Sequence, residues 1–168
     1  KDAGGGGATG GVVTVGSVHG RGGGVVLGSG SGKSTAKNLE ARGAAVVVGT
    51  DGDVQINNGI KTTGVGHSIT VDGKNVNVTG LIDSANDVTL HANRGPGGDL
   101  TTQDIKAKTL SVSALNMTLG DVTLPGRIDL FAGATGTVSV NKLESTLAGA
   151  AVQGQVNIGG GSFSIANN

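Results

Sequence analysis

The residues with the most evident chemical potential form a glycine- and serine-rich segment, Gly28-Ser-Gly-Ser-Gly-Lys-Ser-Thr35. A phosphate-binding loop needs a Gly, four further residues and then Gly-Lys-Ser/Thr, so that successive backbone N–H groups wrap the phosphates. Counting back from Gly32, the first required glycine falls at position 27, which is Leu. A long helix must also follow such a loop, and no helical pattern of that length follows Thr35. We therefore interpret the segment as a strand and a corner, with Lys33 solvated, and expect no nucleotide binding.

Acidic side chains are the next candidates, because glycan-cleaving enzymes set two or three carboxylates close together. Asp83, Asp87, Asp99 and Asp104 fall mostly at expected corners, where Asp commonly forms turns. The partner motifs of such enzymes are missing. We predict that the chain is not an enzyme, and we assign no catalytic or cofactor-binding residue.

The sequence also offers few candidate ligands for a metal ion. His19, His67 and His91 occupy different phases of the repeat described below, so we expect them in solvated loops and not in one cluster. Gly49-Thr-Asp-Gly-Asp53 has the composition of a calcium-binding repeat, but such repeats recur about every nine residues and this one occurs once. The chain has no cysteine, which excludes disulfides, zinc fingers and thiol catalysis. No metal site or cofactor is predicted.

Composition narrows the class of protein further. The chain has 168 residues, which is the size of one domain, so we treat 1–168 as a single unit. Its net charge is zero and only 1% of residues are aromatic, which argues against a nucleic-acid partner. No apolar run approaches the ~20 residues of a membrane span. The first residue is Lys1 and no signal-peptide pattern follows it, so we expect a processed product or a fragment.

Internal repeats decide the organisation, because three series of apolar residues recur in a fixed order about every 21 residues. The first series consists of single residues: Val18, Leu39, Ile60, Leu81, Ile105, Val122 and Leu143. The second consists of pairs: Val25/Leu27, Val46/Val48, Ile69/Val71, Val88/Leu90, Leu110/Val112, Ile128/Leu130 and a weaker Ala150/Val152. The third also consists of pairs: Val13/Val15, Val54/Ile56, Val76/Val78, a degraded slot at Leu100, Met117/Leu119, Val138/Val140 and Val156/Ile158, with Phe163/Ile165 as one further strand.

A spacing of two within each pair is the strand period, and the pairs are rich in β-branched residues. Gly, Asn, Asp and Ser clusters between the pairs make corners. Only Ala36–Arg42 could form two helical turns, and it coincides with a strand position. Three strands and three corners in about 21 residues describe one coil of a parallel β-helix, whose stacked coils share a core. We predict an all-β, right-handed parallel β-helix of about seven to eight coils, roughly 35–40 Å long. A two-layer β-sandwich is the structural alternative.

The outward positions between the apolar residues are polar and short: Gln55, Thr70, Asn77, Thr89, Ser111, Thr118, Asp129, Ser139 and Asn157. A sugar-binding groove would usually carry Trp or Tyr, and the chain has neither. An ice-binding face would need a regular Thr array, and the column Thr70, Thr89, Ser111, Asp129 interrupts one.

Three segments of the chain carry a resemblance to a known family: Asp87-Val-Thr-Leu-His-Ala-Asn93, Asp104-Ile-Lys-Ala-Lys-Thr-Leu-Ser-Val-Ser-Ala114 and Gly120-Asp-Val-Thr-Leu-Pro-Gly-Arg-Ile-Asp-Leu130. They resemble the β-helix repeats of filamentous-haemagglutinin-type exoproteins, which bacteria export by two-partner secretion, and the resemblance runs from about Asn38 onward. The Asn-Pro-Asn signature of that family's secretion domain is absent. The resemblance implies the stalk of a long adhesin and not its transporter-recognised domain.

From these observations we expect a structural, adhesive segment of a secreted bacterial surface adhesin, at the cell surface or in the extracellular matrix, where a host-cell or matrix surface is a possible ligand. The alternative is an extracellular fibre subunit that stacks end to end. Neither end shows a polar or helical cap, so we expect axial continuation into more chain or into a neighbouring copy. Asn77 and Asn116 lie in sequons, the acceptor sites of N-glycosylation.

Overall fold

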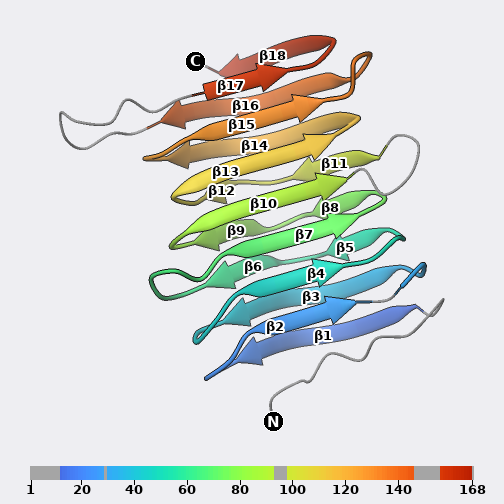
Figure 1. The fold of residues 1–168 in the computed structure, drawn as a ribbon, viewed down its shortest axis with the longest axis vertical. Helices are drawn as coiled ribbons and strands as arrows, with labels where there is room; N and C mark the ends of the chain where they lie inside the picture. The colour runs from blue at the N-terminus through green and yellow to red at the C-terminus, as the bar shows by residue number, and fades with distance from the viewer. Residues whose placement is uncertain (1–11, 29, 93–97, 146–155, 168) are drawn as a thin grey trace.

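The computed structural model describes residues 12–28, 30–92, 98–145 and 156–167, and within these ranges every regular element is a β-strand. All strand pairs are parallel, and the strands stack as a β-solenoid of about seven turns (Figure 1). As the chain climbs from the amino end, the strands of the front sheet run to the right and those of the rear sheet to the left, which makes the coil right-handed (Figure 1). The predicted parallel β-helix is confirmed.

The strands form two sheets that face each other across the core (Figure 1). The rear sheet has eleven strands: β1 (Val13–Gly20), β3 (Ser34–Ala41), β5 (Val54–Ile56), β6 (Gly59–Thr62), β8 (Val76–Val78), β9 (Leu81–Ser84), β11 (Asp99–Thr102), β12 (Ile105–Lys106), β14 (Asn116–Leu124), β16 (Thr137–Ser145) and β18 (Ser162–Asn167). The front sheet has seven: β2 (Val25–Gly28), β4 (Val46–Gly49), β7 (Ile69–Gly73), β10 (Asp87–Ala92), β13 (Thr109–Ala114), β15 (Ile128–Ala132) and β17 (Val156–Gly159).

The second apolar series forms the inner face of the front sheet. Its first members stack in register from one strand to the next, and each is at most 3% exposed: Val25, Val46, Ile69, Val88, Leu110 and Ile128. Each of these strands alternates buried and outward-facing residues, as a strand with one face against a core does. The predicted inward column is therefore confirmed.

The third and first series share the rear sheet, and how they are joined varies along the solenoid. In β1, β3, β14 and β16 one continuous strand carries both segments, whereas the middle coils divide them into β5 and β6, β8 and β9, and β11 and β12. Lys37-Asn38 stays extended within β3, but Asn57-Asn58 separates β5 from β6 because Asn favours a turn. Of the candidate helix Ala36–Arg42, all residues but Arg42 belong to β3.

The first series contains one error in the sequence interpretation, at Leu81. The register pairs Ile60 with Ile82, which is fully buried, whereas Leu81 is 39% exposed. The coil between them is one residue longer than the coil from Leu39 to Ile60. Because side chains alternate along a strand, a shift of one residue turns the other side chain inward.

Similar shifts correct the third series at two places. A repeat of 21 residues before Val54 and Ile56 places Lys33 and Thr35 in the third-series slot of the preceding coil. The register instead pairs Ser34 and Ala36 with Val54 and Ile56, so Ser34 and Ala36 point inward. Val156 pairs with Ile128, which places Val156/Ile158 in the second series and not in the third. The third series instead continues through Phe163, in register with Val138, as expected for one further strand. The weak slot proposed at Ala150/Val152 lies outside the described residues.

Candidate functional site

The glycine- and serine-rich segment forms a corner between two strands. It leaves β2, and its last two residues begin β3, so the element that follows is a strand and not the helix that a phosphate-binding loop requires. The Ser34 side chain is buried, whereas Lys33 is exposed. The backbone N–H of Ser34 donates to the carbonyl oxygen of Asp53 in the next coil (2.8 Å). This amide is therefore committed to the coil stack, which agrees with the strand-and-corner interpretation.

The next coil stabilises this corner through Thr50, which is 3% exposed. Its Oγ1 lies 2.7 Å from the carbonyl oxygens of both Gly30 and Gly32, so the hydroxyl donates across the coil boundary, and it accepts a hydrogen bond from the N–H of Gly52 (3.0 Å). The carbonyl oxygens of Gly30 and Gly32 thus face a donor within the protein. The segment Gly49–Asp53 turns the chain from β4 into β5, and the N–H of Asp51 donates to the carbonyl oxygen of Gly30 in the preceding coil.

The four carboxylates considered for catalysis each have a partner in a neighbouring coil. Asp83 Oδ2 forms an ion pair with Lys61 Nζ (2.9 Å), and Asp87 Oδ1 accepts from Thr109 Oγ1 (2.7 Å). Asp99 and Asp104 belong to the two ladders described below. Within the described part of the chain, no three His, Cys, Asp or Glu side chains could together hold a metal ion.

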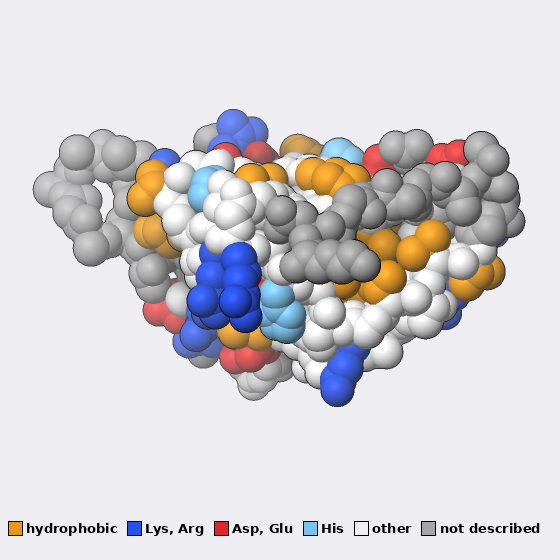
Figure 2. Space-filling view, turned by 90° about the horizontal axis from the view of Figure 1, so that it is seen from below, with side chains coloured by type: hydrophobic (Ala, Val, Ile, Leu, Met, Phe, Trp, Pro, Cys, Tyr) orange, Lys and Arg blue, Asp and Glu red, His pale blue; other side chains and the backbone are white. Residues whose placement is uncertain are grey.

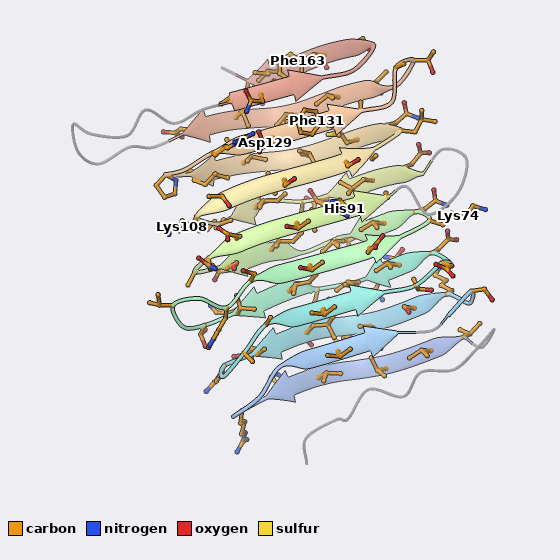
Figure 3. All side chains as sticks on the ribbon, viewed as in Figure 1. Lys74, His91, Lys108, Asp129, Phe131 and Phe163 are labelled. Carbon is orange, nitrogen blue, oxygen red and sulfur yellow. The ribbon has the colours of Figure 1, made fainter. Side chains whose placement is uncertain are left out.

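The three histidines lie apart, as their phases suggested, but two of them are on strands and not in loops. His19 lies on β1, with Nε2 3.4 Å from Glu40 Oε2, and His91 lies on the outer face of β10 (Figure 3). His67 alone lies between strands, where its Nδ1 is 3.1 Å from the Thr63 carbonyl oxygen. The loop expectation was therefore wrong for His19 and His91.

A ladder of polar side chains follows one corner of the rear sheet through five successive coils. Asn75 Nδ2 donates to Asp53 Oδ1 (2.8 Å), and Asn116 Nδ2 donates to Asp99 Oδ1 (2.8 Å). The backbone N–H groups of Asp99 and Thr137 donate to Asn75 Oδ1 and Asn116 Oδ1 (3.0 and 3.1 Å). We call these five residues the corner ladder. Each residue bonds the coil next to it, so the ladder fixes the register of the stack.

A second ladder of polar side chains lies in the carboxyl-terminal coils, at the point in each coil where the third-series segment meets the first-series segment. Asp121 joins the coils on either side, because its N–H donates to Asp104 Oδ1 (3.1 Å) and its own Oδ1 accepts from Asn141 Nδ2 (2.5 Å). Asn167 Nδ2 then donates to Asn141 Oδ1 (2.7 Å). These acids and amides have structural roles.

The structure also places the two sequons. Asn77 lies at the centre of β8, and its Oδ1 is buried. The amide nitrogen of Asn116, the atom that a glycan would modify, donates to Asp99 within the corner ladder. Modification at Asn116 would leave Nδ2 a single N–H and would place a sugar beside this hydrogen bond.

A row of mostly charged side chains runs along the outer face of the first-series strands. Strand register places these residues one above another: His19, Glu40, Lys61, Asp83, Lys106, Thr123 and Glu144. We call this set the charged row. Opposite charges are neighbours from Glu40 to Lys106, so the row is neutral over these four residues.

Ion pairs shift the pKa values of two side chains in the charged row. Arg42 Nε donates to Glu40 Oε1 (2.9 Å), and this bond, with the nearby His19 and Lys61, holds the pKa of Glu40 below its ordinary value. The hydrogen bond and charge of Asp83 raise the pKa of Lys61. A hollow of about 500 Å³ at the amino-terminal end of the row is lined by His19, Arg42 and Glu40 among others, and the Glu40 carboxylate lies between the Arg42 guanidinium and the His19 ring.

The outer face of the front sheet changes character along its length. Its central column begins with Val26 and Val47, which are 56% and 38% exposed, and then becomes polar: Thr70, Thr89, Ser111, Asp129 and Asn157. Figure 3 shows His91, Asp129 and Phe131 on this face. Burial raises the pKa of Asp129, but hydrogen bonds from Arg127 and Asn157 outweigh it, and the net shift is downward. The irregular column matches the sequence expectation.

Comparisons of the chain with protein-family models, with curated proteins and with solved structures find no match. The class that the strand pairing defines is a right-handed parallel β-solenoid. Among the described residues, no helix is long and apolar enough to cross a membrane.

Proposed function

We propose that this chain is a non-enzymatic structural segment of a secreted bacterial surface adhesin, a rod that holds a binding or toxic tip away from the cell. The observation that supports this proposal is the parallel strand pairing from β1 to β18 around one apolar core. In such a stack each inner coil is hydrogen-bonded to the coils above and below, which makes the solenoid stiff along its axis.

The outer surface supports the same proposal. In the corner ladder its carboxylates and amides bond one another between coils, and in the charged row Asp83 bonds Lys61 of the neighbouring coil. Side chains engaged in this way stabilise the stack and are less available to a small-molecule substrate.

The length of the gene tests the stalk proposal. We expect the open reading frame that encodes these 168 residues to be far longer and to contain further β-helix repeats on at least one side. Antibodies against the chain should label intact, unpermeabilised cells. A frame that encodes little beyond these residues, or labelling only after permeabilisation, would contradict the proposal.

An extracellular fibre subunit that stacks end to end is the second candidate, and a specific observation favours it. The last strands expose apolar side chains: Val156 is 41%, Ile158 36% and Phe163 43% exposed. At the other end of the solenoid Val12 is 70% exposed, and Figure 2 shows apolar side chains across that end. Parallel strand edges at both ends could pair with a second copy.

Electron microscopy of the concentrated chain tests axial stacking. We expect fibres that lengthen with concentration and that shorten in the variant Phe163→Ser, because this residue lies on the terminal strand β18. Phe131→Ser is the matched control, since Phe131 is 47% exposed but lies on the face of β15. Fibres that respond equally to both variants, or no fibres at all, would argue against this candidate.

A further inference from the structure

The charged row borders an exposed leucine and a hollow. Leu81 is 39% exposed, and the register places it directly above Gly59, which has no side chain and a φ of 117°. A hollow of about 230 Å³ opens here, and its lining includes Gly59, Leu81, Lys61 and Asp83. This surface therefore combines an apolar projection, an adjacent recess and alternating charges.

The order of charges in this row is self-complementary. From the amino end, Glu40, Lys61, Asp83 and Lys106 read negative, positive, negative, positive, and from the other end they read in the opposite order. Consider a second copy related by a two-fold axis that runs parallel to the strands and passes between Lys61 and Asp83. Lys61 then faces the second copy's Asp83, and Glu40 faces the second copy's Lys106.

The same axis also matches the apolar parts of the surface. Leu81 and Gly59 lie in the same two coils as Asp83 and Lys61, so the rotation sets Leu81 opposite the second copy's Gly59. Each leucine would enter the other copy's recess. Two independent features, charge and shape, thus select one position of the axis.

Neighbouring axis positions satisfy only part of this pattern. An axis one coil nearer the amino end still faces Glu40 with Lys61, but it sets Leu81 opposite Ser17. An axis one coil nearer the carboxyl end sets Glu40 opposite the second copy's Glu144, where like charges repel.

We propose that this surface pairs two copies of the chain side by side and antiparallel, about the axis between Lys61 and Asp83. Six coils would overlap, and with about five residues per strand segment the footprint is roughly 450 Å² per copy. Interfaces of this size belong to weak or transient pairs. Arg42 and the second copy's Lys108 are like charges at the margin, where both are exposed, and they weaken the pair further. The proposal does not depend on the adhesin or fibre function.

A mixing experiment with charge-reversed variants tests the pairing. In the Lys61→Asp variant, positions 61 and 83 both carry a carboxylate, and in the Asp83→Lys variant both carry an ammonium group. Like charges would then face each other across the two-fold axis, so each variant alone should remain monomeric. In an equimolar mixture the carboxylates of one chain face the ammonium groups of the other. We expect sedimentation velocity to show a concentration-dependent dimer for the unchanged chain, loss of at least roughly tenfold in association for each variant alone, and a one-to-one dimer in the mixture.

Two further variants keep the test decisive. Leu81→Asn removes the apolar projection without changing the charge and should also weaken the dimer. Lys74→Asp makes the same charge change as Lys61→Asp and should leave association unchanged. Figure 3 shows Lys74 at the opposite edge of the molecule from Lys108, which lies at the margin of the proposed interface. Circular dichroism should show the same strand content for all variants. The proposal is overturned if the unchanged chain is strictly monomeric, or if association survives Lys61→Asp, Asp83→Lys and Leu81→Asn. It is also overturned if the chain associates only as fibres that these variants leave unchanged, because self-association would then occur at the ends alone.

Discussion

Asn75 Nδ2 donates a hydrogen bond of 2.8 Å to Asp53 Oδ1, one coil below, while Asn75 Oδ1 accepts one of 3.0 Å from the N–H of Asp99, one coil above. A single amide therefore joins three coils. Both halves of the amide are needed, because a carboxylate at this position could accept but could not donate.

Substitution of Asn75 should separate these two contributions. We expect Asn75→Ala to lower the free energy of unfolding by about 1–2 kcal/mol, the usual cost of such lost hydrogen bonds. Asn75→Asp should cost more near neutral pH, because it places a negative charge between Asp53 and Asp99. Urea denaturation at neutral pH and near pH 4 is the measurement, and Asn75→Asp should recover part of its loss in acid. Equal losses for both variants at both pH values would contradict this role of the amide.

The fold could be predicted from the sequence because every coil keeps the same pair of inward residues in the second series. Val46, Ile69, Val88 and Leu110 each begin a pair of apolar residues two positions apart, and the structure stacks these first members as predicted. Coil length varies, and a sequence period cannot show on which side of a corner an extra residue falls. That uncertainty accounts for the error at Leu81.

The residues of the corner ladder share a position in the repeat that can be recognised in the sequence. Asp53, Asn75, Asp99 and Asn116 each directly precede an inward residue of the third series, but each alone reads as a turn former. The charged row could not be predicted, because with Leu81 taken as inward Asp83 would not align with Lys61. Hydrogen-bond partners between coils need the exact register, which the structure supplies.

The inward column predicts a large difference between adjacent positions. Ile69 is fully buried, so Ile69→Asp should cost at least roughly 4 kcal/mol or prevent folding, since an unpaired carboxylate would enter the core. Thr70→Asp introduces the same group one residue later on the outer face and should cost less than about 1 kcal/mol. Chemical denaturation of both variants is the measurement. Similar losses would show that the two side chains do not lie on opposite faces.

The corrected register of the first series makes a similar contrast between Leu81 and Ile82. Ile82→Ala should destabilise the chain by roughly 2–5 kcal/mol through a cavity, whereas Leu81→Ala should change stability by less than about 0.5 kcal/mol. Both should be measured at low protein concentration, so that self-association does not contribute. A reversed order of the two effects would restore Leu81 to the core.

Thr102 offers a stabilising substitution. It occupies an inward position of β11 in register with Val78, is 3% exposed, and its Oγ1 has no hydrogen-bond partner within the described part of the chain. Thr102→Val keeps the shape and removes the buried hydroxyl, so we expect a gain of about 1 kcal/mol in the free energy of unfolding. Thr101→Val, on the outer face of the same strand, should give no such gain. Loss of stability in Thr102→Val would indicate that the hydroxyl is hydrogen-bonded.

Glu40 should show the pH dependence of the charged row. The hydrogen bond from Arg42 lowers the pKa of Glu40 from 4.5, with further lowering by His19 and Lys61. A carboxyl group with a lower pKa in the folded state stabilises the fold above its unfolded pKa. This contribution is lost as the pH falls through the folded pKa. The acid-sensitive window of this group therefore lies below 4.5.

An NMR titration of the side-chain carboxyl carbon between about pH 2 and pH 6 measures this directly. We expect Glu40 to titrate below 4.5 in the unchanged chain and to move upward in Arg42→Gln, which removes the guanidinium. Arg127→Gln is the matched control, because Arg127 bonds Asp129 on the front sheet and should raise the pKa of Asp129 alone. If Glu40 titrates at its ordinary pKa, or responds to Arg127→Gln and not to Arg42→Gln, then the Arg42–Glu40 bond does not persist in solution.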